Sequence, residues 1–198
     1  MQSVNHALFL ALNAPESPST TILSIATMLA QTMIALVPLL LVVGWLRGPK
    51  LIRIGMLQAA CAGILGLSIA QLIGMAWPVP RPFMIGLGHQ FLAHASDASF
   101  PSDHLTLWWS VACSLVLHRR TRLVGGGLAL LGLAMAWSRI YLGVHFPLDM
   151  AGALGVAIVS AGVCQRARLW LAGRPYQLLN ALYHTVFGAA IRRGWLAR

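Results

Sequence analysis

Residues 54–77 read IGMLQAACAGILGLSIAQLIGMAW and contain no charged side chain. A helix needs about 20 apolar residues to cross the roughly 30 Å hydrocarbon layer of a membrane, so this stretch predicts a transmembrane helix. Four other apolar runs predict further spans, at residues 20–46, 103–118, 123–138 and 148–164. The last three are short, so we expect their ends to lie near the membrane interface.

The composition places the chain in the membrane class. Of its 198 residues 58% are hydrophobic and only 9% are charged, and the mean hydropathy is +0.75. A soluble domain of this size cannot hide so much apolar surface in one core. Because no repeat or second unit is visible, we predict one all-α domain over residues 1–198, a polytopic transmembrane helical bundle with five spans, or six if the tail also crosses.

The basic residues cluster at one set of predicted span ends. The formal net charge is +10, and the clusters are Arg47, Lys50 and Arg53, then Arg119, Arg120 and Arg122, then Arg166 and Arg168. This positive-inside pattern places those loops in the cytoplasm and residues 77–102 outside. It favours the bilayer over nucleic acid as partner. Arg81 and Arg139 fall on the outer side, where they need an anionic partner.

Both ends of the chain predict helices that lie on the membrane surface. Apolar residues recur at i, i+1, i+4 and i+5 within residues 175–198, which predicts an amphipathic cytoplasmic helix, with a sixth span as the alternative. Residues 1–19 lack Lys, Arg and a long apolar core, so they resemble an outer interfacial helix more than a signal peptide. Tryptophans near span ends suit interfacial aromatic belts, namely Trp77, Trp108, Trp109, Trp137 and Trp170.

Three polar clusters lie at the outer ends of different predicted spans: RPF at 81–83, SFPSDH at 99–104 and SRIYLGVHFPLD at 138–149. Ionisable groups at membrane depth cost about 2.5–3.5 kcal/mol each, so a group of them indicates function. The guanidiniums of Arg81 and Arg139 match phosphate oxygens. Ser102 and the free N–H groups at the start of the next helix add an anion cradle, while Asp103 suits a helix N-terminus.

The histidines supply the candidate chemistry. Of His104 and His145, one can attack phosphorus while the other protonates the departing oxygen. Asp149 follows His145 by four residues and is placed to fix its tautomer. The clusters contain no carboxylate set suited to magnesium, so we expect no metal and no cofactor.

Taken in order, these clusters resemble the motifs of the type-2 phosphatidic acid phosphatase superfamily, over residues 50–165. RPF supplies the end of KxxxxxxRP, PSDH resembles PSGH, and SRIYLGVHFPLD has the form SRxxxxxHxxxD. The variant SFPSDH with GVHFPLDM is most similar to the bacterial undecaprenyl diphosphate phosphatases. The chain departs from the first motif at Gly74, which stands where that motif has lysine.

The resemblance implies a phosphatase of the bacterial inner membrane that removes the terminal phosphate of a polyprenyl diphosphate on the periplasmic side. It implies a phosphohistidine at His145, with His104 as acid and Asp149 as orienting group. The residues expected to bind phosphate are Arg81, Pro82, Ser102, Asp103, Ser138 and Arg139. Phosphatidate, phosphatidylglycerol phosphate or lipid A phosphate, or transfer to another lipid, remain alternatives, as does a non-catalytic binder or flippase.

Overall fold

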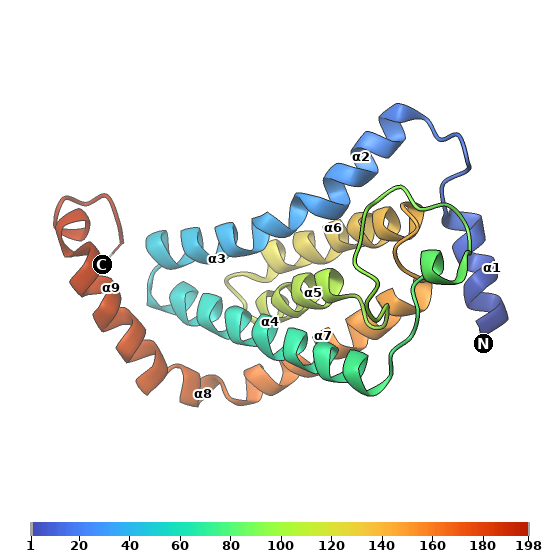
Figure 1. The fold of residues 1–198 in the computed structure, drawn as a ribbon. Coiled ribbons are helices and arrows are strands. Elements are labelled where there is room, and N and C mark those ends of the chain that lie inside the picture. Colours follow the sequence, from blue (N-terminus) through green and yellow to red (C-terminus); the bar gives the residue numbers. More distant parts are fainter. Residues whose placement is uncertain (1, 198) are drawn as a thin grey trace.

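The structure, a computed structural model, describes residues 2–197, and every regular element in that range is a helix (Figure 1). The order is α1 (Gln2–Leu12), α2 (Thr20–Gln31), η1 (Met33–Ala35), α3 (Leu36–Arg47), α4 (Lys50–Ala76), η2 (Pro82–Ile85), α5 (Asp103–Leu117), α6 (Arg122–Tyr141), α7 (Pro147–Arg166), α8 (Arg168–Leu171) and α9 (Arg174–Arg192). The predicted all-α class is therefore confirmed.

Four helices within residues 2–197 are long and apolar enough to cross a membrane: Thr20–Arg47, Lys50–Ala76, Arg122–Tyr141 and Pro147–Arg166. The predicted count of five or six spans is not confirmed. Helix α5 forms where a span was expected, but its 15 residues are fewer than the about 20 that the hydrocarbon layer requires. Helix α9 also forms, yet it is not among the four.

The first span is bent where α2 gives way to α3 through the 3₁₀ turn η1. Pro38 lies two residues into α3 and has no N–H to donate to the carbonyl of Ile34. Because proline removes that hydrogen bond and its ring crowds the preceding turn, the helix tightens there. The bend lets α2 pack on α6 while α3 packs on α4.

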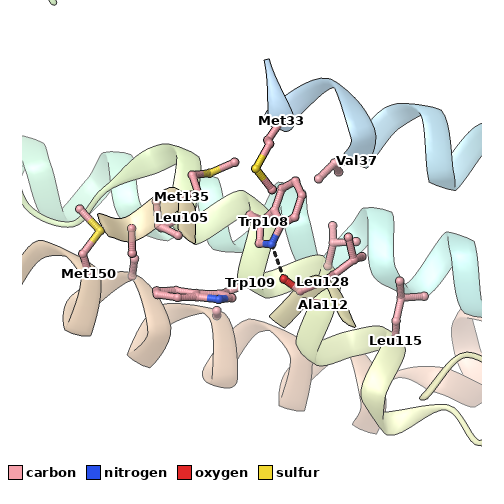
Figure 2. Close-up of a cluster of buried hydrophobic side chains, with 14 of the residues drawn as sticks. Met33, Val37, Leu105, Trp108, Trp109, Ala112, Leu115, Leu128, Met135 and Met150 are labelled. Carbon is pink, nitrogen blue, oxygen red and sulfur yellow. Dashed lines mark hydrogen bonds between the residues drawn. The ribbon is translucent and has the colours of Figure 1, made fainter. Parts of the chain in front are cut away.

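Helix α5 is the centre of the bundle and packs against α4, α6 and α7 (Figure 1). Trp108 and Trp109 are buried on it, and the indole Nε1 of Trp108 donates to the carbonyl of Leu128 at 2.6 Å (Figure 2). The predicted interfacial belt is therefore wrong for these two tryptophans. Their indole N–H groups reach carbonyl groups of α6, which is what allows so large a polar-tipped ring to be buried.

Glycines of α6 explain how closely it approaches α5. A Cβ atom on Gly132 would lie 2.3 Å from Nε1 of Trp109, and one on Gly125 would lie 2.5 Å from the backbone N of Val116. Only glycine fits at these two positions. Gly126 and Gly127, by contrast, have open space beside them.

The two ends of the bundle differ. Helix α9 runs across one end, opposite α1 (Figure 1). Arg53 holds it there, with Nη1 donating to Oδ1 of Asn180, Nη2 donating to the carbonyl of Ala197 and the guanidinium stacked over the ring of Tyr183. Arg53 was predicted to lie among the cytoplasmic surface bases, but it is buried because the tail covers it.

The other end gathers the segments that carry the polar clusters. Helix α1 packs against α6 and α7 there, and the long loop between α4 and α5 folds over the same end (Figure 1). The N-terminus of α5 and the turn between α6 and α7 also lie at this end. All three clusters that the sequence placed on one side of the membrane therefore meet.

Candidate active site

Two local features aim the key side chains inward. Pro82 occupies the first position of η2, where a missing N–H costs nothing, and Arg81 precedes it in extended backbone. Gly143 turns the chain between α6 and α7 with φ +79°, and a Cβ there would meet the carbonyl of His89 at 2.1 Å. This turn places His145 in the interior just before α7 begins at Pro147.

His145, Asp149 and Ser99 form a buried chain of contacts. Nδ1 of His145 lies 3.1 Å from Oδ2 of Asp149. The same oxygen accepts hydrogen bonds from the Ser99 hydroxyl at 2.5 Å and from the backbone N–H of Phe146 at 2.8 Å. These contacts hold a proton on Nδ1 and leave Nε2 of His145 with a free lone pair.

Arg81 donates a hydrogen bond to this nitrogen. Its Nη1 donates to Nε2 of His145 at 2.9 Å and to the carbonyl of Val144 at 2.9 Å. Its Nη2 donates to the carbonyl of Ala98, and its Nε donates to Oδ1 of Asp97 at 2.9 Å. The guanidinium is thus held on three sides against the imidazole.

Arg139 comes from the last turn of α6 and carries a second guanidinium into the interior. Nη1 donates to the carbonyl of Ala30 at 3.2 Å, and Nη2 lies 3.2 Å from Nε2 of His94. Its Nε has no hydrogen-bond partner among residues 2–197, and neither has the buried hydroxyl of Ser102. Buried donors without partners mark a place for an anion, because such groups are normally satisfied.

His104 lies in the first turn of α5 at the edge of an apolar groove. The groove has a volume of about 290 Å³ and is lined by Ile34, Leu67, Gln71, Asp103, His104 and Leu107. Its lining residues come from η1, α4 and α5. A second cavity, of about 590 Å³ between α1, the long loop and α7, reaches Asp149 from another side.

The structure brings His145, Asp149, Arg81 and Arg139 together, with Ser102 and His104 at the start of α5. Three other predicted site residues make different contacts. Pro82 is buried at the start of η2, Asp103 accepts a hydrogen bond from Gln71 of α4 at 2.8 Å, and the hydroxyl of Ser138 donates to the carbonyl of Met135. They shape the elements around the site rather than contacting the two arginines.

The surroundings set the charge of the histidine. Burial lowers the pKa of His145 well below its ordinary value, and the positive charges of Arg139 and Arg81 lower it further. The imidazole is therefore neutral at neutral pH. That is the form whose Nε2 can act as a nucleophile.

Three contributors were not predicted from the sequence: Ser99, His94 and Asp97. Ser99 was noticed only as part of SFPSDH, and no motif includes His94. Their role depends on the path of the long loop, which has no periodic pattern to reveal it. The only available signal was their place between two motifs that must meet.

Within residues 2–197 no group of three or more His, Cys, Asp and Glu side chains is arranged to hold a metal ion. The positive charges near the candidate phosphate position come from the guanidinium groups of Arg81 and Arg139.

Comparison with known proteins identifies the family. A model of the PAP2 superfamily matches residues 55–172. The chain is 36% identical over 196 residues to "Putative undecaprenyl-diphosphatase YbjG" of Escherichia coli (strain K12), covering 99% of this chain and 98% of that protein. It is also 36% identical over 156 residues to undecaprenyl-diphosphatase BcrC of Bacillus subtilis (strain 168), covering 79% of this chain and 80% of that one.

A solved structure shares the fold. Aquifex aeolicus LpxE superposes with a TM-score of 0.67 at 20% identity, covering 82% of this chain and 95% of that chain. At this identity the likeness concerns the arrangement of helices alone.

Proposed function

Because the chain belongs to the PAP2 superfamily of membrane phosphatases, we propose that it hydrolyses the terminal phosphate of undecaprenyl diphosphate and so recycles the carrier lipid for cell-wall synthesis. The observation that carries the proposal is the buried imidazole of His145, held between Asp149 and Arg81. Two relatives at 36% identity bear the name undecaprenyl-diphosphatase, which supports this substrate.

The first chemical step forms a phosphohistidine. Nε2 of His145 attacks the terminal phosphorus while the bond from phosphorus to the bridging oxygen breaks. His104 takes up a proton as the anionic diphosphate binds, because a nearby negative charge favours the imidazolium. It gives this proton to the bridging oxygen, which leaves as the lipid monophosphate. For Nε2 to become free, Arg81 must exchange the imidazole for a phosphate oxygen. The same guanidinium then stabilises the charge that accumulates in the transition state.

Water completes the cycle. It attacks the phosphorus of the phosphohistidine and gives a proton to His104, releasing inorganic phosphate and restoring His145. Asp149 keeps the proton on Nδ1 throughout and stabilises the positive charge of the phosphorylated ring. Arg139 and Ser102 contribute donors, because Nε of the one and the hydroxyl of the other have no partner within residues 2–197.

The apolar groove beside His104 suits the first part of the polyprenyl chain. Ile34, Leu67 and Leu107 line it, and the bridging oxygen must lie next to His104 to be protonated. A lipid whose tail follows this groove presents its diphosphate to the two arginines.

We place the site on the periplasmic side of the bacterial inner membrane. The clustered bases lie at the ends of α3, α5 and α7 away from the site, as the positive-inside rule requires for the cytoplasm. A Ser96→Cys variant in the long loop should therefore react with an impermeant thiol reagent in intact cells, whereas Arg120→Cys should not; both positions are exposed. The reverse labelling would place the site in the cytoplasm.

The decisive experiment measures phosphate release by the purified protein in detergent. Undecaprenyl diphosphate should be the preferred substrate in a panel with phosphatidate, phosphatidylglycerol phosphate and lipid A. With terminally radiolabelled diphosphate, the wild type should give acid-labile labelled protein and His145→Ala should give none. Equal labelling of both proteins would contradict the phosphohistidine, and preference for another lipid phosphate would contradict the substrate.

A further inference from the structure

The site has one phosphate-binding cation fewer than the family motif. Gly74 stands in the lysine position, and no Lys or Arg occurs between Arg53 and Arg81. The space beside Gly74 is a cavity of about 180 Å³ whose lining includes the carboxylates of Asp97 and Asp103. The position that would supply a cation therefore faces acidic groups.

His94 lies where a third donor is needed. It belongs to the long loop, and its Nε2 is 3.2 Å from Nη2 of Arg139. Its ring meets that of His145 edge to face, with centroids 6.1 Å apart. The side chain is 19% exposed, so it borders the site and still reaches solvent.

The other ring nitrogen of His94 is fixed from outside the site. Nδ1 lies 3.2 Å from the carbonyl of Ala95 and 3.7 Å from Oδ1 of Asp97. Both are acceptors, so Nδ1 carries a proton and Nε2 accepts the hydrogen bond from Arg139. Asp97 also accepts from Arg81, which ties this loop segment to both guanidiniums.

We propose that His94 is a third cationic ligand of the substrate phosphate and replaces the lysine that the motif has at position 74. Phosphate displaces the imidazole from Arg139, and Nε2 of His94 takes up a proton from solvent and donates it in a hydrogen bond to a phosphate oxygen. The inference rests on the proposed phosphatase function and adds a binding residue to it.

The charges around His94 account for this change of state. It faces Arg81 from the start of η2, Arg139 from α6, Asp97 from its own loop, and the neighbouring histidines His104 and His145. Burial and the charge of Arg81 lower the pKa of His94, so the ring is neutral. A dianionic phosphate bound between the guanidiniums reverses the sign of the local charge and favours the imidazolium.

The experiment compares the full-length wild type with His94→Gln and His94→Ala in detergent. Glutamine keeps a neutral polar group near the Nε2 position but cannot carry charge. His89→Gln is the matched control, because His89 is an exposed histidine of the same loop. Inorganic phosphate serves as probe by calorimetry in buffers of different ionisation enthalpy, which gives the dissociation constant and the protons taken up.

Loss of one charge-assisted hydrogen bond predicts that both His94 variants bind phosphate about 10- to 100-fold more weakly. They should also take up fewer protons than the wild type, and the KM for undecaprenyl diphosphate should rise by a similar factor with a smaller change in kcat. Wild-type binding by both variants would overturn the proposal. So would wild-type binding by His94→Gln alone, which would show a neutral positioning role.

The phosphate-binding measurement needs no turnover, so the two hypotheses fail separately. If the wild type releases no phosphate from undecaprenyl diphosphate, the proposed function is wrong. The effect of His94 on binding of inorganic phosphate is still decided by the calorimetry.

Discussion

Ser99→Ala tests whether the hydrogen bonds that converge on Asp149 orient the nucleophile. The Ser99 hydroxyl is buried and donates to Oδ2 of Asp149. The same hydroxyl oxygen lies 3.4 Å from Nδ1 of His145. Alanine removes this donor and little volume. After the change, Oδ2 keeps the backbone N–H of Phe146 and the imidazole as donors.

The size of the effect follows from the bond that is lost. A hydrogen bond to a charged group contributes about 1.5–3 kcal/mol, and each 1.36 kcal/mol in the barrier changes the rate about tenfold. We therefore expect kcat to fall about 10- to 100-fold. KM should stay close to the wild-type value, because Ser99 contacts Asp149 and His145 and lies behind the nucleophilic nitrogen.

The assay is steady-state phosphate release at saturating lipid diphosphate, with thermal unfolding as a check of folding. Ser96→Ala is the matched control, because Ser96 is an exposed serine of the same loop. An unchanged kcat in a folded Ser99→Ala protein would show that Asp149 orients His145 without this hydroxyl. A rise in KM alone would show that Ser99 acts on substrate binding.

Three further predictions follow from the packing and charges. Gly74→Lys should not lower KM, because the new ammonium meets the carboxylate of Asp97 before it meets substrate; a lower KM in steady-state kinetics would contradict this. Gly132→Leu should lower the free energy of unfolding by roughly 1–3 kcal/mol, because the new side chain would overlap with Trp109. Gly126→Leu should not lower it, because no described atom lies within 4 Å of its Cβ position. Phosphate release should persist in excess chelator, and a complete loss restored by added magnesium would refute the assignment of charge neutralisation to arginine.

The sequence predicted the helices well because their ends carry chemical signals. The run at 54–77 corresponds to α4 (Lys50–Ala76), and the run at 148–164 corresponds to α7 (Pro147–Arg166). Pro147 suits the first turn of a helix and lacks an N–H that would otherwise need a partner. Motif order was equally informative, because it brought Arg81, Arg139, His145 and Asp149 to the same end of the bundle.

The sequence was less informative where a contact depends on the path of a loop or on a neighbouring helix. Ser99 and His94 reach the site through a loop with no periodicity. The hydropathy of α5 resembles that of a lipid-facing span, yet three helices surround it and bury Trp108 and Trp109. Arg53 resembles a surface base until the tail folds over it, a contact that no local pattern encodes.

The pairing of each guanidinium with an imidazole has a consequence for product release. Arg81 donates to His145 and Arg139 donates to His94, so in the proposed cycle phosphate must displace both imidazoles. When phosphate departs, an imidazole of the protein can accept a hydrogen bond from each guanidinium, so water does not have to replace the anion. In the proposed cycle, the imidazole of His145 therefore competes with the product for Arg81, and this competition favours release of phosphate.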